Sequence, residues 1–231
     1  GYLTTNDGLN SNYIYSVVMD KRGDIWAGTS LGVNIISDNG SVLSNPNNLR
    51  ITSVFALRQQ TINAIAVDPL NNKWIGTNQG LLLVNSDGSS LLATYNTNNS
   101  ALPSDEIRSL AVDQNSGRVY VGTDAGLTSF DTPAVKPEDS FSELFLYPNP
   151  FIVNSGSNKL TIDGLIKDTD IKILNIEGRL IREFSSPGGR IAFWDGRDES
   201  GNFVGSGIYL VVAYDSEGNN ITTSKIAVLH K

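Results

Sequence analysis

The sequence of 231 residues contains no cysteine, one histidine and one methionine. Without cysteine there is no disulfide, no thiolate metal site and no cysteine nucleophile. The single histidine is His230, next to the last residue, so neither a histidine-dependent catalytic triad nor a multi-histidine metal site can form. These absences leave backbone groups, carboxylates and aromatic rings as the chemistry of the chain.

Basic residues are scarce as well, with 17 Lys and Arg against 24 Asp and Glu and a net charge of −7. An acidic surface without basic clusters argues against a nucleic-acid or anionic-membrane partner. No apolar run approaches the roughly 18 residues of a membrane helix, and there is no signal peptide. The chain begins at Gly1 rather than Met, so we expect a fragment of a longer protein, and the missing signal says nothing about its compartment.

The sequence is 39% hydrophobic, enough for one large or two small domains, and its first 130 residues contain three aligned repeats. Each repeat has an apolar run ending in aspartate, a Gly-Thr pair and a second, glycine-led apolar run. The repeated aspartates are Asp20, Asp68 and Asp113, spaced by 48 and 45 residues. The repeated glycines are Gly28, Gly76 and Gly122, spaced by 48 and 46 residues. A period in the forties with several strands per repeat is typical of propeller blades.

The second repeat shows the expected blade most clearly. Period-2 alternation predicts a strand over residues 62–67 with one apolar set, Ile62, Ala64 and Ala66, on one face. Trp74 is expected to fill the space between blades, and Gly76 to let the backbone approach a neighbouring blade. A fourth, outer strand is expected over Leu91–Tyr95. Since helical periodicity is absent throughout, we predict an all-β protein.

Residues 63–81 resemble the two-component regulator propeller repeat nearly position for position. The other two repeats depart from it at Ala27, Val33 and Tyr120, where the apolar character is kept. The resemblance implies a partial β-propeller of three blades over residues 1–131. Closed propellers have roughly four to eight blades, so we expect upstream blades to be missing. The open blade faces then predict self-association, as in two sets of three blades making a six-bladed ring.

Prolines and charge interrupt the pattern after the third repeat, and we predict an interdomain linker over residues 132–143. About seven strands follow in 90 residues, with a pair of prolines ending the first, a density typical of an immunoglobulin-like β-sandwich. The strands after the opening one are expected at residues 159–162, 170–176, 179–184, 190–194, 207–215 and 221–229.

Five segments of the C-terminal part carry a second resemblance: residues 147–151, 173–178, 193–198, 201–209 and 225–228. They look like the flagellar hook-cap (FlgD-type) immunoglobulin-like module and the C-terminal sorting domain of type IX secretion cargo in Bacteroidetes. The resemblance covers nearly all of residues 144–231 and implies a complete sandwich. Trp194, before a tight Asp195-Gly196 turn, is its expected core anchor.

Clustered acidic residues, repeated aspartates and threonines, and three tryptophans are the candidate site residues of the chain. Oxygen ligands gather at Asp195, Asp198, Glu199 and Asn202, but without the spacing of an EF-hand, so a solvated turn is the better interpretation. The repeated aspartates are interpreted as caps of the following turns, and Thr29, Thr77 and Thr123 as turn hydrogen-bonders. The tryptophans, suited to stacking on sugars, are expected to serve packing: Trp26, Trp74 and Trp194. We therefore name no catalytic, cofactor-binding or metal-ligating residue, and expect no cofactor.

The order of the two modules resembles a family of surface components of the type IX secretion system. In that family the C-terminal domain is retained and supplies anionic lipopolysaccharide to the sortase. The resemblance implies a non-enzymatic binding and assembly protein on the surface of a Gram-negative bacterium, with sortase proteins and lipopolysaccharide or another glycan as partners. One alternative is a secreted type IX cargo protein with a glycan-binding or enzymatic propeller and a disposable sorting tag. Another is the periplasmic sensor ectodomain of a two-component system.

Overall fold

The computed structural model describes residues 1–37, 50–154, 158–186 and 188–230. The chain divides into two compact units, Gly1–Thr132 and Pro133–Lys231. Among the described residues the only helical segments are two single 3-10 turns, Thr5–Asp7 and Phe55–Leu57. The predicted all-β fold is thus confirmed. No helix in the described ranges has the length and apolarity to cross a bilayer.

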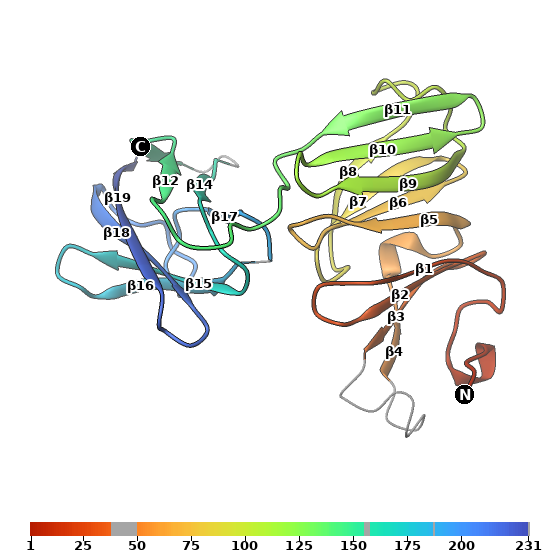
Figure 1. Ribbon diagram of the computed structural model, residues 1–231, viewed down its shortest axis with the longest axis horizontal. Coiled ribbons are helices and arrows are strands. Elements are labelled where there is room, and N and C mark those ends of the chain that lie inside the picture. The colour runs from red at the N-terminus through yellow and green to blue at the C-terminus, as the bar shows by residue number, and fades with distance from the viewer. Residues whose placement is uncertain (38–49, 155–157, 187, 231) are drawn as a thin grey trace. The chain divides into compact units, whose positions relative to one another are not determined.

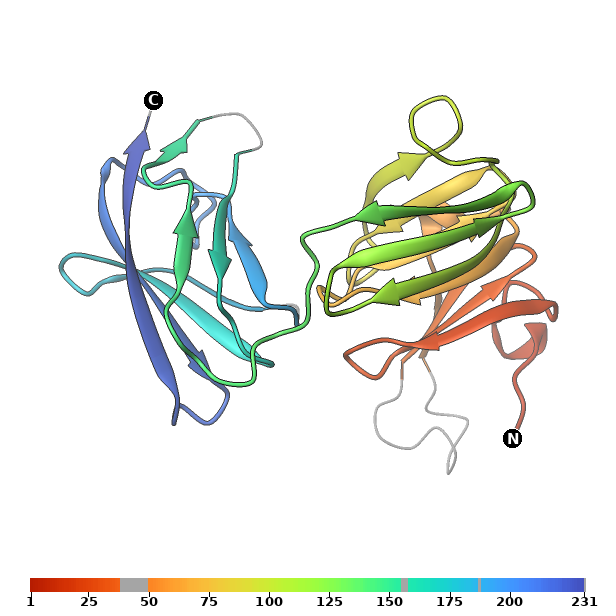
Figure 2. The same cartoon turned by 45° about the horizontal axis from the view of Figure 1, so that its top comes forward.

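Three antiparallel sheets make up the first unit, and in each the strands lie side by side in chain order. Figures 1 and 2 show them as successive layers, coloured from red to green. The first sheet contains β1 (Ile14–Met19), β2 (Ile25–Thr29), β3 (Gly32–Ser37) and β4 (Arg50–Ser53). The second contains β5 (Ile62–Val67), β6 (Lys73–Thr77), β7 (Gly80–Val84) and β8 (Leu91–Tyr95). The third contains β9 (Ile107–Asp113), β10 (Arg118–Thr123) and β11 (Gly126–Asp131). We call these sheets blades 1, 2 and 3; the predicted outer strand of blade 2 is confirmed as β8.

The inner strand of each blade contains a β-bulge that the simple alternation did not predict. In blade 2, Ile62 lies opposite Thr77 while Ala64 lies opposite Gly76, so one extra residue, Asn63, stands between them. The same irregularity occurs at the matching places of blades 1 and 3. Because a bulge reverses the facing of the residues beyond it, Ile62 and Ala64 point to opposite faces of the sheet. The expectation that they share a face was therefore wrong.

Tight turns after the Gly-Thr pairs shape each blade in the same way. The hydroxyl groups of Thr29, Thr77 and Thr123 each accept a hydrogen bond from the backbone N–H two residues later. The next strand then starts at a glycine with φ of +115°, +125° or +143°, a region that favours glycine. The recurring Gly-led third strand is therefore a backbone requirement of this turn.

Two apolar cores of the first unit lie between neighbouring blades, and a smaller one lies between blade 1 and the segment that precedes it. Trp26 packs between blades 1 and 2 with Leu57, Ile62, Ile75 and others. Trp74 packs between blades 2 and 3, where its ring stacks on Tyr95 with the centroids 5.8 Å apart. Each blade therefore depends on its neighbours for burial, as expected for a propeller-like array.

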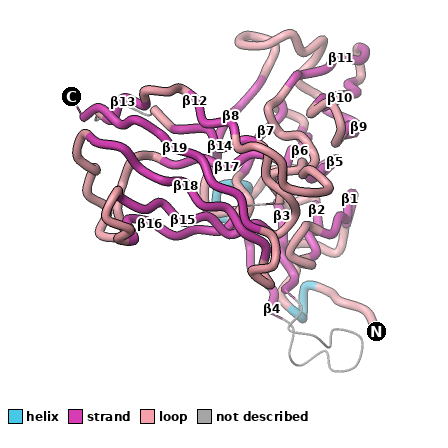
Figure 3. Tube along the Cα trace, turned by 60° about the vertical axis from the view of Figure 1, so that its left-hand side comes forward, coloured by secondary structure: helices cyan, strands magenta, loops and turns pink. Residues whose placement is uncertain are grey.

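The second unit is a two-sheet β-sandwich. One sheet has the order β12 (Phe145–Tyr147), β14 (Leu160–Asp163) and β17 (Ile191–Trp194). The other has the order β13 (Phe151–Val153), β19 (Ile221–His230), β18 (Gly207–Asp215), β15 (Thr169–Asn175) and β16 (Leu180–Ser185), which Figure 3 shows side by side. The strand β13 was not predicted. It pairs with β19 in parallel, and parallel neighbours distant in sequence leave no turn signal to recognise.

Trp194 anchors the core of the sandwich, as predicted. Its side chain is buried, and its ring lies 6.0 Å from that of Phe151 and 5.9 Å from that of Tyr209. The indole N–H donates to the carbonyl of Arg197 at 2.9 Å. This hydrogen bond satisfies the one polar atom of the ring and fixes the turn after β17.

Much of the segment predicted as a linker, residues 132–143, lies against the sandwich. Ala134 is buried, and the carbonyl of Val135 accepts a hydrogen bond from the N–H of Arg190 at 3.0 Å. The N–H of Glu138 donates to the carbonyl of Leu165 at 2.9 Å. The backbone after Pro133 is thus held within the second unit.

Candidate functional site

The repeated aspartates of the propeller blades close the turns that follow them. Asp20 accepts hydrogen bonds from two backbone N–H groups of its turn, at 2.8 and 3.1 Å. Asp68 accepts one from Asn72 at 2.9 Å, and Asp113 accepts one from Asn115 at 3.0 Å. The three carboxylates thus belong to three separate turns, one in each blade. Among the described residues, no group of three or more His, Cys, Asp or Glu is arranged to hold a metal ion.

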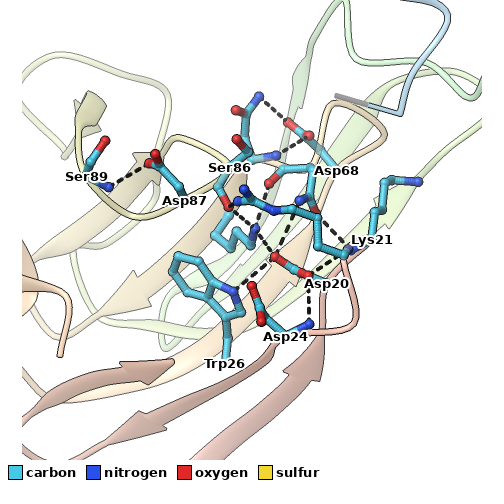
Figure 4. A network of polar contacts seen from close by, with 12 residues as sticks. Asp20, Lys21, Asp24, Trp26, Asp68, Ser86, Asp87 and Ser89 are labelled. Atoms are coloured by element: carbon cyan, nitrogen blue, oxygen red, sulfur yellow. Dashed lines mark hydrogen bonds and ion pairs between the residues drawn. The ribbon is translucent and has the colours of Figure 1, made fainter. Parts of the chain in front are cut away.

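Asp20 also takes part in a buried ion pair across the boundary of blades 1 and 2 (Figure 4). The ammonium group of Lys73 lies 2.7 Å from its carboxylate, and both side chains are fully buried. Lys73 also donates to the carbonyls of Asn71 and Ser86, at 2.9 and 2.6 Å. The Trp26 indole N–H donates to the same carboxylate at 3.2 Å, and its ring lies 4.4 Å from the ammonium nitrogen.

The charges of this pair compensate one another. Burial alone would raise the pKa of Asp20. The hydrogen bond and positive charge of Lys73, together with backbone hydrogen bonds from Arg22 and Asp24, outweigh burial and hold that pKa below its usual value. Every polar atom of the pair has a protein partner and the pair is closed to solvent. We therefore interpret it as a structural clasp between blades rather than a reactive centre.

At the boundary of blades 2 and 3 the same aspartate position has no such partner. Asp68 is buried, and Val119 occupies the strand position that corresponds to Lys73. Within the described residues no ion pair reaches Asp68. Burial raises the pKa of Asp68, although hydrogen bonds from Asn72 work against the shift. The same repeat position therefore holds an ion-paired carboxylate with a lowered pKa at Asp20, and a buried carboxylate with a raised pKa at Asp68.

The acidic cluster of the sandwich closes turns and covers a sheet edge. Asp198 accepts hydrogen bonds from two backbone N–H groups, of Ser200 and Asn202, both at 2.9 Å. The N–H of Glu199 donates to the carbonyl of Ile181 at 3.0 Å, while its carboxylate accepts from the N–H of Glu183 at 2.7 Å. Glu199 therefore satisfies part of the free edge of β16, which hinders edge-to-edge pairing there.

A cavity of about 270 Å³ lies between the two edge strands β16 and β17 of the sandwich. Two cations, three aromatic residues and one carboxylate line it: Lys159, Arg182, Phe184, Phe193, Trp194 and Asp195. We call it the edge pocket. The Phe193 ring is exposed, and the ammonium group of Lys159 lies 5.9 Å from its centroid.

The two cations of the edge pocket differ in how firmly they are held. One guanidinium nitrogen of Arg182 donates to the carbonyl of Asp198 at 3.1 Å, and this nitrogen also lies 3.8 Å from the Glu199 carboxylate. This anchoring orients the planar fork, which suits bidentate recognition of carboxylate or phosphate. Lys159, which also lines the pocket, supplies a second positive charge. The arrangement matches a sugar ring that carries an anionic group.

The edge pocket could not be predicted from the sequence, because Lys159 and Arg182 are isolated cations in separate segments of an acidic chain. The buried Lys73 did leave a signal. It stands in an apolar strand where the other two blades have Ile25 and Val119. The tryptophans lie where packing was expected: Trp26, Trp74 and Trp194 are all buried.

The first repeat matches a known protein family, and the chain as a whole is similar to solved structures. The two component regulator propeller family matches residues 8–30. Among solved structures, the chain is similar to PorZ of Porphyromonas gingivalis, described as an essential bacterial surface component of the type IX secretion system. The identity is 32% and the TM-score 0.60, over 94% of this chain and 30% of the PorZ chain.

A second similar structure is the extracellular domain of the putative hybrid two component system BT3049 from B. thetaiotaomicron. The identity is 14% and the TM-score 0.44, over 99% of this chain and 33% of that one. The chain thus spans about a third of the length of each of these proteins. No curated protein matches the sequence.

Proposed function

We propose that the chain is part of a non-enzymatic binding and assembly component of the type IX secretion system on the outer surface of a Gram-negative bacterium. The observation that carries the proposal is the similarity to PorZ, which runs through both units at 32% identity. PorZ is described as a surface component of that system. Because the chain spans 30% of the PorZ length, the proposal concerns the part that these two units play.

The sandwich is proposed to engage anionic lipopolysaccharide and the sortase machinery. The edge pocket supports this role, because Arg182 and Lys159 line it together with the exposed aromatic ring of Phe193. A guanidinium and an ammonium group attract a phosphate or carboxylate, and the ring packs against the apolar face of a sugar. The carboxylates of Asp20, Asp198 and Glu199 lie in a closed ion pair, a turn and an edge contact, roles that suit a scaffold for recognition.

Exchange of both cations tests the pocket. We expect the double variant Lys159→Gln/Arg182→Gln to bind anionic lipopolysaccharide at least about tenfold more weakly, since each lost charge-assisted hydrogen bond is worth roughly 1.5–3 kcal/mol. Surface plasmon resonance, with the full chain titrated over immobilised anionic lipopolysaccharide, measures the change in affinity. The control is Lys167→Gln, which removes an exposed cation outside the edge pocket. Neutral lipopolysaccharide is expected to bind the unaltered chain weakly.

Equal binding of anionic and neutral lipopolysaccharide would contradict the electrostatic part of the proposal. Unchanged affinity in the double variant would remove the edge pocket from it. Raising the salt concentration should weaken binding, because the cations are partly exposed and screened.

The main competing function is a cargo protein whose sandwich is removed as a sorting tag. Two backbone hydrogen bonds, at Val135 and Glu138, hold the start of the second unit to the rest of it. A protease needs extended and accessible backbone, so these contacts favour retention. Intact mass spectrometry of the native protein distinguishes the two functions: a mature chain that keeps the sandwich supports assembly, and loss of the sandwich shows cargo.

A further inference from the structure

The outer face of the three-stranded sheet of the sandwich carries exposed aromatic rings. Side chains alternate between the two faces of a sheet, and those of β12, β14 and β17 that point inward pack in the core: Leu146, Leu160, Ile162, Ala192 and Trp194. The outward positions include Phe145 and Tyr147 of β12 and Phe193 of β17, which are 58%, 48% and 41% exposed. We call these three residues the aromatic face.

Two rings of the aromatic face lie in one row across the sheet. Thr161 of β14 is opposite Tyr147 on one side and opposite Phe193 on the other. Neighbouring strands lie about 4.8 Å apart, so the backbones that carry these two rings are about 10 Å apart. Phe145 lies two residues before Tyr147, a rise of about 7 Å along β12. The rings are therefore spread over the face of the sheet.

The aromatic face is continuous with the edge pocket, because the ring of Phe193 belongs to both. Lys159 lies at the same junction, with its ammonium group 5.9 Å from the centroid of that ring. Lys159 stands two residues before Thr161 and therefore has the same facing. A ligand held by the cations of the edge pocket thus extends onto the aromatic face by passing over Phe193.

Polar groups occupy the outward positions between the rings. Thr161 provides a hydroxyl group between Tyr147 and Phe193. Asp163 lies opposite Phe145, and its carboxylate accepts a hydrogen bond from Arg190 at 3.2 Å. A carbohydrate chain has the matching pattern, because each sugar offers an apolar face that packs on an aromatic ring and hydroxyl groups that hydrogen-bond beside it.

We propose that the aromatic face binds the sugars that adjoin the anionic group in the edge pocket, so that the sandwich recognises a stretch of glycan chain. Because the pocket brings the glycan to the face, this binding depends on the proposed function of the pocket. The occupant is a carbohydrate chain, since the face shares a ring with the pocket and carries hydrogen-bonding groups between its rings. One sugar seated at Phe193 does not reach a ring on a backbone about 10 Å away, so contact with Tyr147 requires a longer ligand.

The length of the ligand tests the proposal. The probes are the anionic polysaccharide released from lipopolysaccharide and a fragment of it trimmed to the single sugar that bears the anionic group. Calorimetric titration into the full chain measures both affinities. We expect the variant Phe145→Thr/Tyr147→Thr to bind the polysaccharide about tenfold more weakly, because two ring contacts are lost, and to bind the fragment unchanged. Threonine suits a β-strand, so the sheet is kept.

Two further variants define the expected pattern. Phe193→Thr should weaken the binding of both ligands, because its ring belongs to the pocket as well as to the face. Ile208→Thr/Ile221→Thr is the matched control. It removes two apolar side chains, 48% and 61% exposed, from strands β18 and β19 of the other sheet, and should leave both affinities unchanged.

Unchanged binding of the polysaccharide by Phe145→Thr/Tyr147→Thr would overturn the proposal and indicate that protein, and not a glycan, covers the aromatic face. An equal loss for polysaccharide and fragment would also overturn it, because the rings would then have no role specific to the longer ligand. If Lys159→Gln/Arg182→Gln still weakens both ligands in either case, the proposed function of the edge pocket stands alone. Binding of neither ligand by the unaltered chain would overturn both proposals.

Discussion

Replacement of Asp20 by asparagine is expected to lower the free energy of unfolding of the first unit by about 3–5 kcal/mol, the cost of breaking a buried ion pair on one side. The change keeps the shape of the side chain but leaves the Lys73 ammonium group buried without a counter-charge. Two backbone carbonyls would still accept its hydrogen bonds, yet they carry no full charge. Hydrogen exchange of amides in β1–β7 measures the loss, since the two units need not unfold together.

Asp68→Asn is the matched control, because the two aspartates occupy the same repeat position. Asp68 is buried without an ion pair, so its neutralisation removes a desolvation cost instead of creating one. We expect a change of less than about 1 kcal/mol at neutral pH. Equal losses in the two variants would show that the turn, and not the charge pair, makes Asp20 important.

The pH dependence of the two variants should also differ in sign. The pKa of Asp20 lies below its usual 3.8, so its contribution to stability is present above that pH and is lost as the pH falls through the lowered pKa. The pKa of Asp68 lies above 3.8, so its contribution is full below that pH and is lost as the pH rises through the raised pKa. The stability difference between the unaltered chain and Asp20→Asn should therefore shrink in acid, while Asp68→Asn should gain relative to the unaltered chain as the pH rises.

The second large effect is expected at the boundary of blades 2 and 3, where the side chain of Ile107 packs closely against Gly76. Ile107→Ala should cost about 2–5 kcal/mol, because it empties a fully buried site. Gly76→Ala should cost about 1–3 kcal/mol, because its methyl group would meet Ile107 at 2.6 Å. In the double variant the added methyl group occupies part of the emptied space, so the combined loss should be smaller than the sum.

Gly122→Ala is the control for this series. The nearest atom to the added Cβ would be the Ser109 hydroxyl oxygen, which can rotate away, so we expect a loss below about 1 kcal/mol. Hydrogen exchange of the backbone amides in β9 and β10 compares the stability of the variants. A Gly76→Ala variant as stable as Gly122→Ala would contradict the close approach of the blades.

The parts of the fold that the sequence predicts are those with local signals. The repeats, the outer strand Leu91–Tyr95 and the long final hairpin each combine alternating apolar residues with a turn of fixed chemistry. The β-bulge beside Ile62 and the parallel strand β13 leave no such trace, because both are set by pairing with distant segments. The edge pocket is similarly non-local: Lys159, Arg182 and Phe193 meet only after two sheets pack together.

The central proposal is that the protein assembles with the type IX secretion machinery at the cell surface. The most direct measurement is affinity purification of the native, full-length protein from outer membranes, with quantification of co-purifying sortase and anionic lipopolysaccharide. We predict that both are enriched over a mock purification and that the lipopolysaccharide is lost with the variant Lys159→Gln/Arg182→Gln. Recovery of neither the sortase nor anionic lipopolysaccharide from intact membranes would contradict the proposed assembly with the type IX secretion machinery.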